Sequence, residues 1–172
     1  MGLFKGKYLP IYCGIIVLIA DFLSKHYTHE YLPVMRHYLL WYPYGGIGVF
    51  ENFFGIEFSI SHQINHGAAW GILADYQQPL LYMRIILIVF LVFYAIFFTK
   101  NKSWHIPLAL IIAGAIGNVV DYFIYGHVVD MFHFVLWGYD FPVFNVADSA
   151  ICIGIFSLIT LSFFSKKKAG RK

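Results

Sequence analysis

The feature that most constrains the fold is a set of four long apolar stretches, at about residues 8–25, 80–99, 104–124 and 144–164. A helix that crosses the hydrocarbon core of a bilayer needs about 20 mainly apolar residues, and each stretch approaches that length. Only 12% of the residues are charged, whereas a soluble domain has about 25%, so too few charges remain to cover a surface in water. The sequence therefore predicts an all-α membrane protein, a single domain over residues 1–172 with four transmembrane helices.

The basic residues predict how these helices are oriented. Lys5 and Lys7 precede the first stretch, Lys100 and Lys102 separate the second from the third, and the segment 165–172 is a basic tail. Lys and Arg in short flanks mark the cytoplasmic side. We therefore expect a multi-pass membrane protein with both termini in the cytoplasm. The connections at about 26–79 and 125–143 then face outward.

The first outward connection is too long to be a simple linker. Between residues 56 and 61, apolar and polar side chains alternate, a two-residue period typical of a half-buried strand. Glycines and aromatic rings nearby favour turns and the membrane interface. We therefore expect a small outward-facing β-containing cradle within about 26–79.

Four aspartates are predicted to meet near the outer boundary of the membrane. At about 1.5 Å per residue, Asp21 lies roughly 20 Å along the first stretch and Asp121 roughly 26 Å along the third. Asp130 follows the third stretch, and Asp148 lies in the first turn of the fourth, which begins outside. Ionisable groups at membrane depth are costly and usually functional, so this convergence predicts a site.

The surroundings of Asp130 and Asp148 predict different protonation states. Asn145 is placed to cap the fourth helix with Asp148 at the third helical position, where the helix dipole favours an ionised carboxylate. Asp130 has the apolar neighbours Val129 and Met131, which would desolvate its carboxyl group and raise its pKa. Two carboxylates that share one proton activate water for attack on a peptide bond in aspartic proteases. The expected roles are therefore base for Asp148 and acid for Asp130.

Four segments carry a family resemblance. They are Asp21-Phe22-Leu23-Ser24-Lys25; Asn65-His66-Gly67-Ala68-Ala69-Trp70-Gly71; Gly117-Asn118-Val119-Val120-Asp121 with Gly126-His127-Val128-Val129-Asp130; and Phe144-Asn145-Val146-Ala147-Asp148. In order, spacing and membrane placement they resemble the signal peptidase II family, the lipoprotein signal peptidases.

The resemblance implies roles for particular residues. Asp130 and Asp148 match the family's catalytic dyad, and Asp21 and Lys25 match a structural pair of the first helix. The positions that match substrate-binding or site-lining residues are Asn65, Gly67, Asn118, Asp121, Tyr122 and Asn145.

The resemblance also implies the reaction. Family members remove the signal peptide of a prolipoprotein by cleaving just before its diacylglyceryl-modified cysteine, without a metal or organic cofactor. The implied location is the bacterial inner membrane. The expected partners are the lipid-modified prolipoprotein and membrane lipids, with no nucleic acid, and we expect a monomer.

The chain departs from the family pattern at two positions. Phe22 stands where the family usually has Gln, and Tyr122 stands where it usually has Arg. A guanidinium offers several donors in a fixed fork, whereas Tyr offers one hydroxyl. Lys25, His127 or His133 could supply the missing charge, or Asp121 could have a different role here.

Three other functions are alternatives to the peptidase. A transporter or channel would use intramembrane acids as a cation or proton path. A metalloenzyme would use the histidines, for example His62 and His66, but no H-E-x-x-H motif occurs, and histidines of outer loops are usually solvated or interfacial. A serine hydrolase would need a motif such as G-x-S-x-G, which is missing.

Overall fold

Four long helices dominate the computed structural model, which describes residues 5–35, 41–66 and 76–169. They are α1 (Lys5–Tyr31), α2 (Gln77–Phe97), α3 (His105–Tyr125) and α4 (Val146–Ala169), and a short 3-10 turn, η3 (Lys102–Trp104), precedes α3. All four are long and apolar enough to cross a membrane. The predicted number of spans is therefore confirmed.

Two helix ends differ from the sequence prediction. α1 ends at Tyr31 rather than near Lys25, because Lys25 is buried among acidic partners instead of beginning a solvated loop. α4 continues to Ala169, so the segment expected as a basic tail from residue 165 is helical as far as that residue. Lysines are good helix formers, and the dipole favours them in the last turns of a helix.

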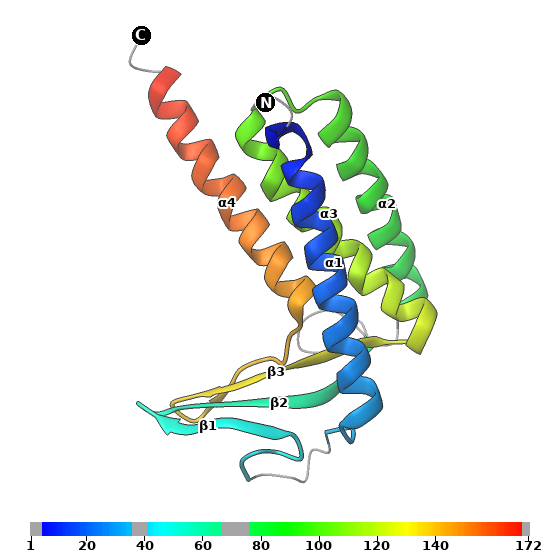
Figure 1. Ribbon diagram of the computed structural model, residues 1–172, viewed down its shortest axis with the longest axis vertical. Coiled ribbons are helices and arrows are strands. Elements are labelled where there is room, and N and C mark those ends of the chain that lie inside the picture. Colours follow the sequence, from blue (N-terminus) through cyan, green and yellow to red (C-terminus); the bar gives the residue numbers. More distant parts are fainter. Residues whose placement is uncertain (1–4, 36–40, 67–75, 170–172) are drawn as a thin grey trace.

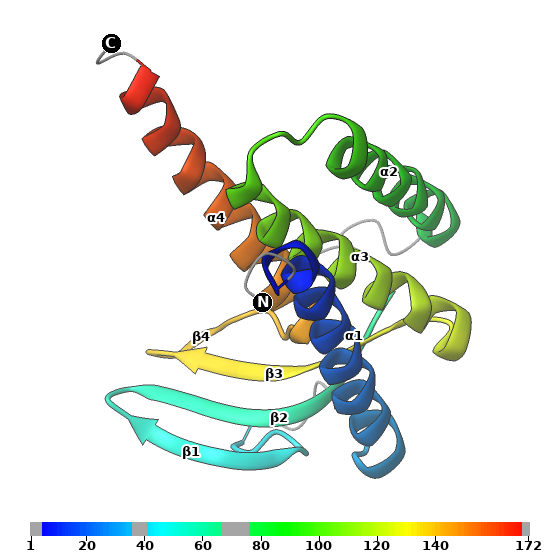
Figure 2. The ribbon, with the colours of Figure 1, turned by 45° about the horizontal axis from the view of Figure 1, so that its top comes forward.

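α3 packs against each of the other three helices, with α1 and α4 beside it and α2 at the edge (Figures 1 and 2). Two glycines of α3 permit the close approach. A Cβ atom on Gly114 would collide with the carbonyl oxygen of Ala147, and one on Gly117 would lie 2.5 Å from a carboxylate oxygen of Asp21. Both contacts lie where α1, α3 and α4 meet.

The outer surface of the helices is apolar, as a lipid environment requires. Ile16 of α1, Ile86 of α2 and Phe156 of α4 each expose more than half of their surface. Large exposed apolar patches mark interaction or membrane surfaces. The buried apolar side chains lie mainly on α3, on the first turns of α4 and at the start of β3, with two more at the start of α2.

A four-stranded antiparallel sheet lies at one end of the helices, which we call the sheet end (Figure 1). Its order is β1 (Ile47–Phe53), β2 (Ile56–Asn65), β3 (Val128–Leu136) and β4 (Tyr139–Asp140). The predicted cradle within 26–79 is thus present as β1 and β2, but the sheet also uses the connection between α3 and α4. The sequence Val128–Leu136 is apolar at most positions, so it lacks the alternation that reveals a half-buried strand.

The strand predicted from residues 56–61 buries its polar side. Ser59 and Ser61 are fully buried, and their hydroxyl oxygens lie 3.2 Å apart. On the other side of β2, Phe58 stacks on Phe134 of β3 with ring centroids 4.3 Å apart. Around residues 58–61, β2 therefore directs its hydroxyl groups toward the interior and the Phe58 ring to the opposite face.

Candidate active site

Lys25 is the centre of a buried ionic network at the sheet end. Its side chain is 0% exposed, and its Nζ lies 2.7 Å from Oδ2 of Asp21 and 2.8 Å from Oδ2 of Asp121. The ammonium also donates to Oδ1 of Asn118 at 2.9 Å. Because a buried charge is tolerated only when it is paired and hydrogen-bonded, these three partners explain how Lys25 is accommodated.

The two acids of this network also hold backbone groups. Asp21 Oδ1 accepts from the Ala147 N–H at 2.8 Å, which joins α1 to the first turn of α4. Asp121 Oδ2 accepts from the Val129 N–H at 3.2 Å, which joins α3 to β3. The network therefore positions the beginnings of the two elements that carry Asp148 and Asp130.

Asn145 and Asp148 form a reciprocal cap at the start of α4. The Asp148 N–H donates to Oδ1 of Asn145 at 2.8 Å, and the Asn145 N–H donates to Oδ2 of Asp148 at 3.3 Å. This is the capping-box arrangement, with Asn and Asp in place of Ser and Glu. The capping predicted from the sequence is confirmed.

Two asparagine carboxamides connect Lys25 to the carboxylates, and their orientations are determined. An ammonium and a backbone N–H can only donate, so Lys25 faces Oδ1 of Asn118 and Asp148 N–H faces Oδ1 of Asn145. The amide nitrogens then point the other way. Asn118 Nδ2 donates to Asp148 Oδ1 at 2.8 Å, and Asn145 Nδ2 donates to Asp130 Oδ1 at 2.6 Å.

Asp130 is the more deeply buried of the two carboxyl groups that these amides reach. It lies on β3 and is 1% exposed, and its second oxygen accepts from Asn65 Nδ2 at 2.9 Å. Burial, and then the nearby charge of Asp148, raise the pKa of Asp130 to about 7. Asp148 is only half-buried. Asp130 is therefore suited to carry a proton at neutral pH, as its apolar neighbours predicted.

The structure brings most of the predicted site residues together. The residues that share the hydrogen-bonded network are Asp21, Lys25, Asn65, Asn118, Asp121, Asp130, Asn145 and Asp148. Tyr122 is half-buried beside the Phe123 ring, and Gly67 lies outside the described residues. Because these acids gather at one end of the helices, they do not form a path across the membrane.

The sequence leaves open whether Lys25, His127 or His133 supplies the charge of the missing arginine, or whether Asp121 has a different role. Lys25 is the group that pairs with Asp121. His133 instead lies 2.7 Å from Oδ1 of Asp140, and His127 faces two other histidines. The cation beside Asp121 is therefore Lys25.

Some features of the site were not predicted from the sequence. Asp21 and Asp121 accept from the backbone N–H groups of Ala147 and Val129. A backbone donor is present at almost every residue, so the sequence does not mark these two. The prediction that His62 is solvated or interfacial is wrong: it is 3% exposed on β2, because His29 and the segment that follows α1 lie against it. Its proximity to His29 depends on α1 continuing past Lys25, and the available signal was that His29 lies one helical turn beyond that lysine.

The membrane-length helices hold two aspartates linked by asparagine amides at one end, and aspartic peptidases use a pair of neighbouring carboxyl groups. The family model described as "Signal peptidase (SPase) II" matches residues 13–164, and the chain belongs to this family of aspartic signal peptidases, which remove the signal peptides of prolipoproteins.

Two solved structures, each described as a bacterial membrane enzyme studied by the in meso method, resemble the chain. The 2.3 Å structure is 29% identical with a TM-score of 0.76, and the match covers 95% of this chain and 91% of that one. The 1.9 Å structure is 30% identical with a TM-score of 0.70, and the match covers 88% of this chain and 90% of that one. The chain is accordingly a multi-pass bacterial membrane enzyme.

Proposed function

We propose that the protein cleaves diacylglyceryl-modified prolipoproteins just before the lipid-modified cysteine, with Asp130 and Asp148 as the catalytic pair. The observation that carries this proposal is the link through Asn145, which accepts from the Asp148 N–H and donates to Asp130. This link holds two carboxyl groups of different burial in one site.

The proposed reaction uses one shared proton. Asp148 removes a proton from a water molecule, and the oxygen of that water attacks the scissile carbonyl carbon while Asp130 protonates the carbonyl oxygen. As the resulting gem-diol collapses, one of its hydroxyl groups returns a proton to Asp130, the C–N bond breaks, and the proton held by Asp148 passes to the amine of the cysteine. A carboxyl group with a pKa near the working pH is an efficient donor, and the raised pKa of Asp130 supports this assignment.

The other polar residues have positioning roles in this proposal. Asn118 and Asn145 orient the two carboxyl groups, and Asn65 holds Asp130 from the β2 side. Gly67 and Tyr122 are assigned to substrate contact, and Asp121 with Asp21 and Lys25 maintains the site. The chemistry needs no metal or organic cofactor.

We also propose that the sheet end faces outward from the bacterial inner membrane and that both termini are cytoplasmic. The connection between α2 and α3, which contains Lys100 and Lys102, lies at the end of the helices away from the sheet, where α1 also begins and α4 ends (Figure 1). Basic flanks favour the cytoplasm, which puts the sheet on the outer side. The lipid-modified precursor and membrane lipids are then the partners of a monomer.

The test is cleavage by purified protein in detergent, with lipidated and unlipidated precursor as substrates. Asp130→Asn and Asp148→Asn should each lower kcat/KM by about 100-fold to 10,000-fold or more, because they remove a group that exchanges a proton during the reaction. Asp140→Asn is the matched control, since its carboxylate is 74% exposed on β4. Near-parental cleavage by a folded Asp130→Asn or Asp148→Asn variant would exclude the aspartyl pair.

A further inference from the structure

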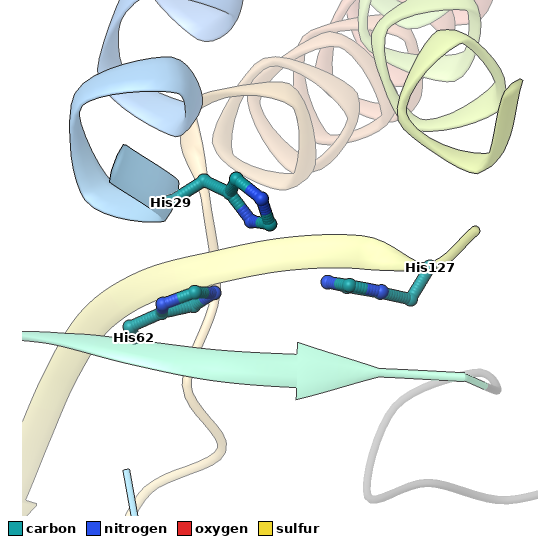
Figure 3. Close-up of side chains that lie close together, drawn as sticks. All are labelled: His29, His62 and His127. Carbon is teal, nitrogen blue, oxygen red and sulfur yellow. The ribbon is translucent and has the colours of Figure 1, made fainter. Parts of the chain in front are cut away.

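Three histidines from separate elements face one another near the sheet end (Figure 3). His29 lies in the last turns of α1, His62 lies on β2, and His127 lies between α3 and β3. One possible ligand atom of each residue lies within 4.8 Å of those of the other two. The His29 ring is 5.4 Å from that of His62 and 6.0 Å from that of His127, measured between centroids.

Each ring has a buried nitrogen with no hydrogen-bond partner among the described residues. These atoms are Nδ1 of His29, Nε2 of His62 and Nε2 of His127. A buried polar atom without a partner is costly, and native proteins satisfy nearly all of them. Three such atoms in one cluster indicate a shared ligand.

The hydrogen bond made by the second ring nitrogen of His62, Nδ1, determines the tautomer of the neutral ring. Nδ1 of His62 lies 3.0 Å from the carbonyl oxygen of Leu32. A carbonyl can only accept, so Nδ1 carries the proton and Nε2 presents its lone pair. Metal-binding histidines are commonly oriented in this way by a carbonyl group on the second nitrogen.

We propose that His29, His62 and His127 bind one divalent transition metal ion, with Zn²⁺ as the best fit and water in the fourth position. Neutral imidazoles suit Zn²⁺ and Cu²⁺, whereas Ca²⁺ and Mg²⁺ prefer oxygen ligands. Zn–N bonds of about 2.0 to 2.1 Å place the nitrogens of a tetrahedral site about 3.3 Å apart, so the rings move closer together on binding. The exposed His66, with its ring 5.7 Å from that of His127, lies beside the cluster.

The position of the cluster suggests what the ion does. His29 follows Lys25 by one helical turn, His62 precedes Asn65 on β2, and His127 precedes Asp130. An ion held by the three histidines would cross-link the elements that carry those polar residues without touching the reacting atoms. We therefore assign it a stabilising role, and metal binding to a folded site raises folding stability by mass action. This assignment does not depend on the proposed peptidase mechanism.

The first test measures binding by the full-length protein, purified in detergent with an affinity tag that lacks histidine. After treatment with EDTA, Zn²⁺ is titrated in competition with a chromophoric chelator, and Co²⁺ is added separately as a spectroscopic probe. We expect one Zn²⁺ per chain and the visible d–d bands of tetrahedral Co²⁺. Absence of stoichiometric binding would overturn the proposal.

Substitution of each of the three histidines tests whether the ion binds at this cluster. His29→Gln and His127→Gln should each weaken Zn²⁺ binding at least tenfold and abolish the tetrahedral Co²⁺ spectrum, and circular dichroism verifies that they fold. His62→Gln should do the same, although its burial makes folding more sensitive to the change. His26→Ala is the matched control, because this exposed histidine of α1 stacks on Phe22 outside the cluster. Equal binding by all variants, or equal loss in the control, contradicts the proposed site.

The stabilising role has its own readout. Zn²⁺ should raise Tm of the parent protein and leave Tm of His127→Gln unchanged. Cleavage measured well below Tm should proceed at a similar rate with and without the ion. Loss of cleavage on removal of Zn²⁺ from a folded protein would instead mean that the ion acts in the reaction, and the stabilising role would be wrong.

Discussion

The ammonium of Lys25 donates to Oδ1 of Asn118 at 2.9 Å, and this contact determines which end of the carboxamide faces Asp148. Because Oδ1 is occupied by Lys25, Nδ2 is directed to the Asp148 carboxylate. A residue that touches only the supporting network thus controls the hydrogen bonding of a proposed catalytic group.

Replacement of Lys25 by Met should destabilise the protein. The change keeps an unbranched side chain but leaves Asp21 and Asp121 without their cation, and removal of one partner of a buried ion pair costs about 3–5 kcal/mol. Urea unfolding in detergent measures the effect. Lys25→Met combined with Asp21→Asn and Asp121→Asn should recover much of the loss. Full stability of the single variant would show that the ion pairs contribute little.

The stability of the folded protein should depend on the protonation of Asp130. Its pKa is raised from 3.8 to about 7, so the folded state holds this proton more tightly than the unfolded chain does. Stability from this group is complete below about pH 4 and is lost as the pH rises to about 7. Asp130→Asn has no such proton, so relative to the parent it should gain stability from pH 4 to pH 8. Thermal unfolding of parent and variant at pH 4 and pH 8, with Asp140→Asn as control, tests the direction of this change in relative stability.

Cleavage should fall as the pH rises above about 7. Ionisation of Asp130 removes the proton that the scissile carbonyl oxygen receives, and the pKa of about 7 places this loss near neutral pH. The profile of kcat/KM should be bell-shaped, with limbs that belong to the coupled pair rather than to either carboxyl group alone. Initial rates with lipidated precursor from pH 5 to pH 9 provide the measurement. A kcat/KM that stays constant from pH 7 to pH 9 would contradict the role of Asp130 as the proton donor.

Addition of a methyl group at Gly117 should disturb the site, whereas the same change at Gly14 should not. A Cβ atom on Gly117 would lie 2.5 Å from Asp21 Oδ2, but on Gly14 its nearest neighbours would be 3.7 Å away. Overpacking costs about 1–3 kcal/mol, while Gly to Ala within a helix gains about 0.5–1 kcal/mol. Unfolding of the two variants should therefore shift in opposite directions. Equal shifts would show that Asp21 moves aside freely.

Replacement of Tyr122 by Phe should have a modest effect on activity. The ring lies beside Phe123, and Lys25 already supplies the cation for Asp121, so only one hydroxyl is lost. A hydrogen bond between uncharged groups contributes about 0.5 to 1.5 kcal/mol, which limits the loss in kcat/KM to about tenfold. Tyr122→Arg should also be tolerated. A larger loss in a folded Phe variant would contradict the expectation that the hydroxyl contributes no more than one hydrogen bond between uncharged groups.

Helix positions and the start of α4 could be predicted because they depend on local sequence. The apolar stretches indicated the spans, and the spacing of Asn145 and Asp148 indicated the cap. Rise per residue was enough to predict that Asp21 and Asp121 lie at similar depths.

Other features depend on contacts between distant segments and could not be predicted in this way. β3 forms because its backbone pairs with β2, and its almost uniformly apolar sequence has no strand period. Lys25 could be assigned to Asp21 from helical spacing, but its contact with Asp121 requires the packing of α1 against α3. The histidine cluster similarly requires the extended end of α1, the sheet pairing and the turn after α3.

The ion pair between Asp21 and Lys25 also has a consequence for biogenesis. Both charges belong to α1 and lie one helical turn apart, with Nζ and Oδ2 2.7 Å from each other, so the helix carries its own neutralising partner while it enters the membrane. Charged side chains are costly in hydrocarbon, and this internal pairing lowers that cost before α3 and α4 have been synthesised. The first helix can therefore insert alone, and the Ala147 N–H completes the hydrogen bonding of Asp21 only when the last helix arrives.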